Sequence, residues 1–440
     1  STVATDPSTG LMLERLLRLI VILAVLAGIY IAFWAARRSA KGSAGGPPPW
    51  RDTKVLVIAA QVAALGVILS VGDYLWANFR ARTDEIGLEL NFDFLDQPSG
   101  ISIADSPLDP NSSIQSALVA GVKNTFLIFI VGIPLAVMLG TLIGIARLST
   151  NWLLTKIATV YVEFFRNIPT LLVIVFTWQA LLLGFPREQD SWLIRGSSTP
   201  ADSGPPALEG LFIFNNKRFA FPSIGGGENF GAFQVVFLVG LVAAVAVWIW
   251  RTRNFDATGT PHRRVLWSFA TLLVISIIGF VALGGPFSIS RPMIDQRITS
   301  GGIKMQMPYI AVMFGLVLYT ASHIAEIVRG SIMSVPKGQV EAGNALALSG
   351  FQRYRFVVLP QAFRVAFPPL INQFLNYTKN TSLAIAVGFA ETTGVIQNLF
   401  GQSRPAPQLL LILMLIYLTF SLILSAIGNL INRRLQIVGR

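Results

Sequence analysis

The fold is decided by a short loop sequence, Lys337-Gly-Gln-Val-Glu-Ala-Gly-Asn-Ala-Leu-Ala-Leu-Ser-Gly-Phe351, which lies between Pro336 and Pro360. Prolines on both sides of a stretch rich in Ala and Leu predict a short helix. Val340 is followed seven and eleven positions later by Ala347 and Phe351, which predicts an apolar stripe on that helix. A short amphipathic helix is marginal alone in water. We therefore expect it to dock on the protein's own helices, on the lipid surface or in the groove of a partner protein.

Long apolar segments surround this loop. The chain has 440 residues, of which 53% are hydrophobic and 13% charged, whereas about 25% are charged in soluble proteins. A helix needs about 20 mainly apolar residues to cross the hydrocarbon layer. Eight segments meet this requirement: 11–36, 54–79, 117–146, 158–184, 230–250, 265–285, 306–335 and 408–432. The sequence therefore predicts an all-α integral membrane protein.

A ninth segment, Phe367–Ala390, is too polar to face lipid. It starts with a Pro-Pro pair, which we interpret as a helix start, and Asn372, Asn376 and Lys379 follow on one helical face. A charged side chain near the bilayer centre costs at least about 3 kcal/mol, so this face should meet protein or water. We predict that it lines a solute path. The alternatives are bonds between neighbouring helices and, for Lys379, a structural ion pair.

Positive charge assigns the sides of about nine predicted spans. Lys and Arg concentrate in alternate loops, at 37–54, 147–156, 251–264, 337–364 and 433–440, and such loops are cytoplasmic. This places the C-terminus in the cytoplasm and the loops 80–116 and 185–229 outside. The first segment is interpreted as an anchor helix. A cleaved signal peptide is the alternative, but the apolar run is too long and Arg37-Arg38 follows it.

Composition excludes several classes of function. With 34 Lys and Arg against 22 Asp and Glu the net charge is +12, which basic cytoplasmic loops explain without nucleic acid. There is no cysteine and there are two histidines, so we expect no metal site and no cofactor. No lysine is followed by Ser or Thr, which excludes a P-loop. We therefore predict a chain that is not an enzyme, and any ATP must be hydrolysed by a partner.

Several motifs carry a resemblance to a known family. Glu341-Ala342-Gly343, followed by Val357-Val358-Leu359-Pro360, resembles the EAA loop of membrane subunits of bacterial ABC importers, and Leu359-Pro360-Gln361-Ala362 is similar to its polar amino-acid branch. Further similar motifs are Lys123-Asn124-Thr125, Gly144-Ile-Ala-Arg147, Tyr161-Val-Glu163-Phe-Phe-Arg166-Asn167-Ile-Pro169, Ala325-Glu326-Ile-Val-Arg329-Gly330, Ser334-Val-Pro336-Lys-Gly338-Gln and Thr378-Lys379-Asn380-Thr381-Ser382-Leu383. Two positions depart from the family pattern: Gly343 replaces an Ala, and Ala347 replaces a Gly.

The resemblance implies a multi-pass permease subunit in the bacterial inner membrane, with the five-helix core of a type I ABC importer. That core would comprise 117–184 and 306–440, with the coupling loop at 336–360. Segments 1–80, 80–116 and 185–305 would be, respectively, anchor helices, a periplasmic loop, and an inserted periplasmic loop with two extra helices. The implied partners are an ABC ATPase subunit, a second related permease, a periplasmic amino-acid-binding protein and a polar or general L-amino acid as substrate.

The resemblance also implies roles for individual residues. Coupling to the ATPase is expected from the loop residues Glu341, Ala342, Gly343, Ala345, Ala347 and Gly350, with Leu359 and Pro360. By their i, i+3 spacing, the pairs Glu163–Arg166 and Glu326–Arg329 are interpreted as local ion pairs that fix helix ends, with a gating role as the alternative. The alternative function is a secondary amino-acid transporter driven by an ion gradient. A secondary transporter of this kind typically has inverted repeats and carboxylates within the membrane. The candidate carboxylates in this sequence are Glu163 and Glu326, and both lie near membrane faces.

Overall fold

The computed structural model describes residues 53–85, 87, 91–102, 109–199, 207–259, 263–295, 298–402 and 404–435, with scattered residues between 19 and 37. The chain forms two units, residues 1–92 and 93–440. In the first unit, α2 (Thr53–Glu85) is a helix long and apolar enough to span a membrane. The predicted first span, 11–36, lies outside the described residues except for those scattered positions.

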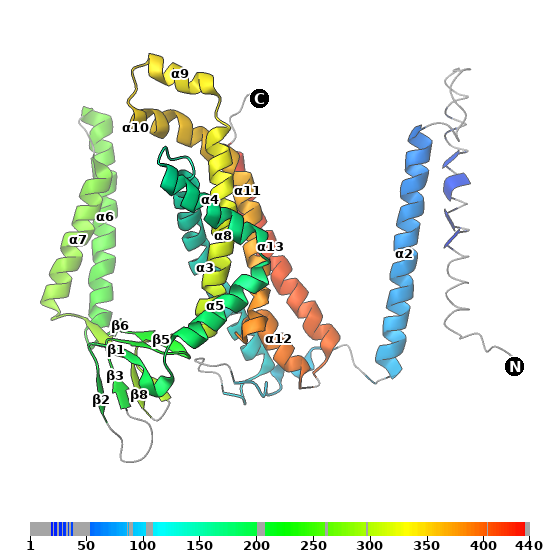
Figure 1. The fold of residues 1–440 in the computed structure, drawn as a ribbon, viewed down its shortest axis with the longest axis horizontal. Helices are drawn as coiled ribbons and strands as arrows, with labels where there is room; N and C mark the ends of the chain where they lie inside the picture. Colours follow the sequence, from blue (N-terminus) through cyan, green and yellow to red (C-terminus); the bar gives the residue numbers. More distant parts are fainter. Residues whose placement is uncertain are drawn as a thin grey trace. The chain divides into compact units, whose positions relative to one another are not determined.

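Helices dominate the second unit (Figure 1). The longer ones are α3 (Ile114–Ala146), α4 (Trp152–Asn167), α5 (Thr170–Gly184), α6 (Phe230–Thr258), α7 (Arg264–Ala282), α8 (Met307–Met333), α11 (Leu359–Asn380) and α13 (Ala406–Leu435). The shorter ones are α9 (Lys337–Ala345), α10 (Gly350–Arg353), α12 (Thr392–Phe400), the 3₁₀ helices η2 (Asp93–Asp96), η3 (Glu188–Asp190) and η5 (Thr381–Val387), and the π-helix η4 (Tyr354–Val358).

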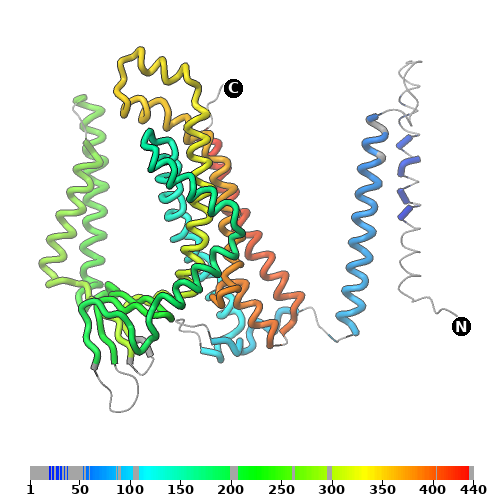
Figure 2. The backbone as a smooth tube through the Cα atoms, viewed as in Figure 1, coloured from blue at the N-terminus to red at the C-terminus, as the bar shows by residue number. Residues whose placement is uncertain are grey.

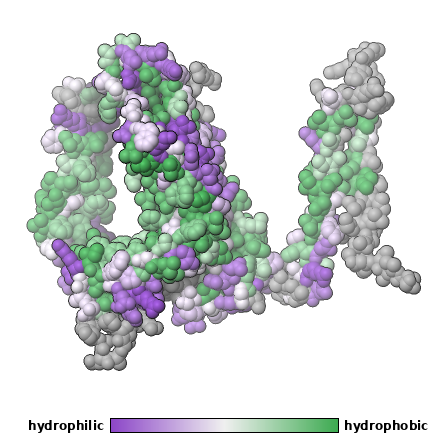
Figure 3. Space-filling model, viewed as in Figure 1, coloured by the Kyte–Doolittle hydropathy of each residue, from purple (hydrophilic) through white to green (hydrophobic). Residues whose placement is uncertain are grey.

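The membrane-protein class predicted from the sequence is confirmed. Among the described residues, six helices are long and apolar enough to span a membrane, and two bent helix pairs would raise the number to eight. The predicted number of nine is not confirmed. In the second unit, hydrophobic surface covers the middle of the helices and hydrophilic residues gather at both ends (Figure 3), as expected for helices surrounded by lipid.

Helix α8 is the centre of the core, and α3, α4, α5 and α11 pack around it. Glycines allow the closest of these contacts. A Cβ added at Gly140 of α3 would lie 2.7 Å from the Cβ of Ile324 on α8, and one at Gly315 of α8 would lie 2.8 Å from Ile174 of α5. Small residues at helix crossings let backbones approach closely and gain packing energy. This packing explains why Ile324 and Ile174 are fully buried.

The prediction of one continuous span at 158–184 is wrong. The segment forms two helices, α4 and α5, which meet at an angle of 109°. Ile168 joins them with extended backbone angles, φ −102° and ψ 135°, because a residue before proline avoids the helical region. Pro169 then precedes the first residue of α5. By contrast, Pro134 lies inside α3, which continues through it.

The interpretation of the Pro-Pro pair as a helix start is also wrong. Helix α11 begins at Leu359 and contains both Pro368 and Pro369 before it ends at Asn380. Proline inside a membrane helix is tolerated where neighbouring groups satisfy the backbone groups that it frees. The rest of the predicted ninth span continues as η5, so the polar segment changes from an α-helix to a 3₁₀ helix.

Ten short strands fill the loops on the predicted outer side. They are β1 (Trp192–Ile194), β2 (Ser197–Thr199), β3 (Ala207–Glu209), β4 (Phe212–Phe214), β5 (Arg218–Phe221), β6 (Ser223–Gly226), β7 (Phe287–Ser290), β8 (Met293–Asp295), β9 (Ile298–Ser300) and β10 (Ile303–Gln306). The antiparallel sheets have the orders β1-β4-β5-β10, β2-β3-β8-β9 and β6-β7. The sequence does not predict these strands, because each has only three or four residues.

Candidate functional site

The loop between α8 and α11 projects at one end of the second unit, opposite the strands (Figures 1 and 2). Helix α9 ends at Ala345, and α10 begins at Gly350 behind a capping box, in which the Ser349 and Gln352 side chains each bond the other's backbone N–H. The predicted apolar stripe is therefore wrong, because Ala347 and Phe351 lie beyond the end of α9. Val340 packs on a small buried cluster, whereas the Phe351 side chain is 73% exposed.

The predicted coupling residues occupy three places. Glu341, Ala342 and Ala345 lie exposed on α9, Ala347 and Gly350 lie exposed in the turn and at the start of α10, and Leu359 and Pro360 lie exposed at the start of α11. Gly343 alone is buried. The exposed residues of α9 and the turn form a protruding surface that a second protein can reach.

The structure gives a packing reason for one departure from the family pattern and shows a backbone cost for the other. Gly343 lies inside α9, where an added Cβ would be 3.3 Å from Cγ of Arg353, and the Arg353 guanidinium donates to the Asn344 side-chain oxygen. Glycine thus makes room for the arginine stem. Ala347 has a φ of 55°, the left-handed conformation that usually ends a helix at a glycine. An alanine there carries about 1–2 kcal/mol of backbone strain.

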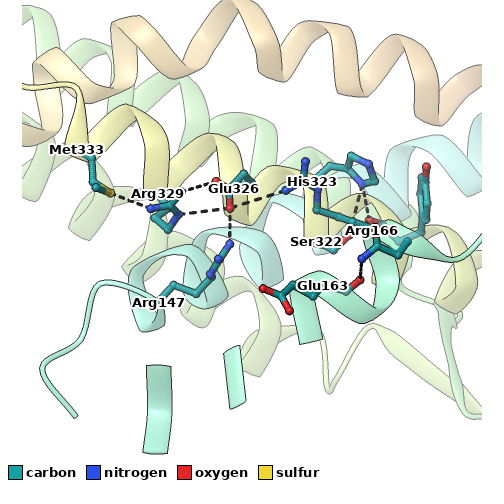
Figure 4. Close-up of polar contacts among 10 residues, drawn as sticks. Arg147, Glu163, Arg166, Ser322, His323, Glu326, Arg329 and Met333 are labelled. Atoms are coloured by element: carbon teal, nitrogen blue, oxygen red, sulfur yellow. Dashed lines mark hydrogen bonds and ion pairs between the residues drawn. The ribbon is translucent and has the colours of Figure 1, made fainter. Parts of the chain in front are cut away.

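A cluster of four charged residues lies at the predicted inner ends of three helices (Figure 4). Glu326 of α8 accepts from Nη2 of Arg329 at 2.5 Å and from Arg147 at the end of α3, and Arg166 of α4 lies 3.9 Å away. The predicted Glu326–Arg329 pair is therefore present. The predicted Glu163–Arg166 pair is not among the ion pairs of the described part of the chain, because Arg166 turns to Glu326 instead.

This charged cluster ties α3, α4 and α8 together. A second bond reinforces the attachment of α4, since the Tyr161 hydroxyl donates to the Leu318 carbonyl at 2.7 Å. Three guanidinium groups surround one carboxylate, so the cluster carries a net charge of +2. Such an excess of positive charge suits the cytoplasmic end of membrane helices.

The predicted path face of α11 is present as an exposed surface. Asn372, Asn376 and Lys379 are all exposed, as their spacing predicts. Lys379 lines a groove of about 680 Å³ between α11 and α13, together with Thr393, Tyr417 and further residues: Leu375, Ser382, Leu413, Leu418, Ser421, Leu422 and Ser425. The two asparagines are not among the lining residues, so the structure separates them from the groove that contains Lys379.

Behind this groove lies a buried carboxylate that the sequence analysis missed. Glu391 has no exposed surface and caps the N-terminus of α12, where the N–H groups of Thr393 and Gly394 donate to it at 2.9 and 3.1 Å. Hydroxyl groups of Thr125 and Tyr417 also donate, at 3.1 and 2.9 Å. Four donors balance the loss of hydration that burial imposes. A sequence signal was available, because an acidic residue before a helix start is a typical cap.

The class of protein follows from the loop, from the helices around α8 and from the similarity of the sequence to a family model. The family model described as "Binding-protein-dependent transport system inner membrane component" matches residues 132–437. The chain therefore belongs to this family.

Three relatives match nearly the whole chain. The general L-amino acid transport system permease protein AapQ of Rhizobium johnstonii is 35% identical over 88% of this chain and 94% of its own length. The putative amino-acid ABC transporter permease protein YhdX of Escherichia coli is 32% identical, over 92% and 99%. The glutamate/glutamine/aspartate/asparagine transport system permease protein BztB of Rhodobacter capsulatus is 34% identical, over 88% and 96%.

Proposed function

We propose that this chain is a permease subunit of an ATP-driven importer for polar or general L-amino acids in the bacterial inner membrane. An ABC ATPase subunit binds the exposed surface of α9 and the following turn. A second related permease completes the translocation path, and a periplasmic binding protein delivers the amino acid. The names and full-length matches of the relatives support the substrate class.

One observation carries the coupling role: a short helix that is exposed along most of its length is nevertheless fixed to the protein at one point. Val340 packs with Val335, Val358 and Ala362, at the end of α8 and the beginning of α11. Glu341 on the same helix is exposed. A short helix that is isolated in water is only marginally stable. A helix that is anchored to the protein through Val340 but otherwise exposed is therefore well suited to bind in the cleft of a partner protein.

The test is a charge reversal at Glu341. We expect Glu341→Lys to abolish uptake and co-purification of ATPase activity, while membrane insertion is retained. The matched control is Asn254→Lys, which places the same charge on an exposed residue of α6 at the same end. Normal uptake by Glu341→Lys would disprove coupling through α9. Transport by proteoliposomes that needs an ion gradient and no ATP would instead establish the secondary transporter.

We also propose that the groove beside Lys379 belongs to the solute path. The ammonium group of Lys379 supplies a positive charge for a solute carboxylate, and the hydroxyl groups of Ser421 and Ser425 on α13 supply hydrogen bonds. An intramembrane charge is a functional candidate by default. Asn372 and Asn376 lie on the same face of α11, outside this groove, where they extend the polar surface along the helix.

A further inference from the structure

The ribbon formed by β6 and β7 has one polar and one apolar face. Ser223 pairs with Ser290, Ile224 with Ile289, Gly225 with Ser288, and Gly226 with Phe287. Directly paired residues of an antiparallel ribbon point to the same side, and successive residues alternate. Ile224, Ile289 and Phe287 therefore share one face, and the serines share the other.

The serine face is polar and only partly covered, since Ser223 is half-buried while Ser288 and Ser290 are exposed. The Ser290 hydroxyl oxygen accepts from the N–H of Gly302 at 3.3 Å, next to the start of β10. The isoleucine face is uncovered, with Ile224 74% and Ile289 67% exposed. Two exposed isoleucines directly opposite each other form a continuous apolar surface, and water is a poor environment for it.

Phe287 connects this apolar face to the ends of two membrane helices. Its ring packs against Phe230 and Phe233 of α6, at centroid distances of 5.6 and 5.2 Å, and against Phe280 of α7 at 6.1 Å. The ribbon lies directly at the ends of these helices (Figure 1). The apolar face of the ribbon therefore continues the apolar surface of α6 and α7.

Short linkers hold the ribbon at the level where the hydrocarbon layer ends. Residues 227–229 join β6 to α6, and residues 283–286 join α7 to β7. The Gly227 N–H donates to the Pro286 carbonyl at 2.9 Å, which closes the two linkers together. Helix α7 has 19 residues and is therefore about 28 Å long, close to the roughly 30 Å of hydrocarbon. Near its outer end, Val281 is 70% exposed, as expected for a lipid-facing residue.

We propose that the β6–β7 ribbon lies on the outer leaflet of the bilayer, with Ile224 and Ile289 inserted among the lipid acyl chains. The occupant of this face is lipid, because the face is continuous with the lipid-facing surface of α6 and α7 and carries no charged residue. The ribbon thereby fixes the strand region of residues 192–306 against the membrane. The inference rests on the membrane-protein class of the chain and does not depend on the proposed substrate or ATPase.

The test uses single cysteines, which is straightforward because the chain has none. Ile289→Cys places a spin label on the apolar face, and Ser288→Cys, one residue away, places the matched control on the serine face. The full chain, with the subunits that co-purify, is reconstituted in phospholipid nanodiscs. Collision of each label with oxygen, which partitions into hydrocarbon, is compared with collision with a water-soluble nickel chelate.

We expect the oxygen-to-nickel collision ratio to be severalfold higher at position 289 than at 288, with Ile224→Cys behaving like position 289. Equal ratios at 288 and 289 would show that the apolar face is in water and would overturn the proposal. Exclusion of both reagents from position 289 would show that protein covers the face, and would overturn it as well. An unchanged thermal unfolding midpoint of each labelled variant shows that the fold is intact.

Discussion

Removal of the Glu326 carboxylate should loosen the ends of three helices at once. The variant Glu326→Ala leaves the guanidinium groups of Arg147, Arg166 and Arg329 together without a counter-charge. Side-chain exposure decides how much each pair contributes: 14% for Arg147, 28% for Arg329 and 42% for Arg166. Water and salt therefore screen the Arg166 pair most and the Arg147 pair least.

The magnitude follows from these exposures. Removing one partner of a fully buried pair costs about 3–5 kcal/mol, and an exposed pair contributes about 0–1 kcal/mol. The Arg147 pair, intermediate but closer to buried, should account for about 2 kcal/mol, and the other two for about 1 kcal/mol together. For 440 residues that unfold together, a loss of about 3 kcal/mol lowers the melting temperature by roughly 3 °C.

The assay is thermal unfolding of the purified protein in one detergent at low and high salt. The matched control is Glu163→Ala, which removes an exposed carboxylate on α4, in the predicted inner region, that does not contact Glu326 (Figure 4). We expect the free energy of unfolding of this control to lie within about 0.5 kcal/mol of the wild-type value. The reasoning is refuted if Glu326→Ala melts like the wild type, or if Glu163→Ala is destabilised to the same extent.

Three further changes test other parts of the structure. Ala347→Gly should raise the free energy of unfolding by about 1 kcal/mol, because the left-handed backbone suits glycine; a lower melting temperature would contradict this. Gly140→Ala should cost about 1–3 kcal/mol through overpacking against Ile324, whereas Gly72→Ala, with no atom within 4 Å, should be tolerated. Lys379→Ala should change uptake kinetics or substrate preference, and Lys379→Arg should preserve them; identical transport by both variants would remove Lys379 from the path.

The long apolar helices could be predicted because their signal is local. Twenty apolar residues in sequence define a span whatever the rest of the chain does, and α3, α6, α7, α8 and α13 all follow such segments. The exposed face of α11 could also be predicted, because helical spacing alone places Asn372, Asn376 and Lys379 together. The sequence could not show that Lys379 lines the groove while Asn372 and Asn376 lie outside it, because the groove is formed with α13, which is distant in the sequence.

The features that the sequence did not reveal depend on contacts between distant residues. Pro134 and Pro169 both follow apolar residues, yet α3 continues through one while α4 ends before the other. Strand β3 has only three residues, and it pairs with β8, which is distant in the sequence. The local sequence of β3 is therefore too short to predict a strand. Glu391 follows an apolar segment in the sequence, and only the fold brings Thr125 and Tyr417 to it.

The loop and the charged cluster together suggest how movement at α9 would reach the membrane helices. Val340 rests on Val335, directly after α8, and on Val358 and Ala362 near the start of α11, so a displacement of α9 acts on both helices. Helix α8 is joined through Glu326 to α3 and α4, and α4 bends by 109° into α5. An ATPase that binds α9 would therefore move α8 and α11 directly, and α3 and α4 through the arginines and through their packing on α8. Glu326→Ala should therefore reduce uptake more than ATPase binding, because it removes the ionic part of the connection between α8 and the helices α3 and α4 and leaves the coupling surface intact.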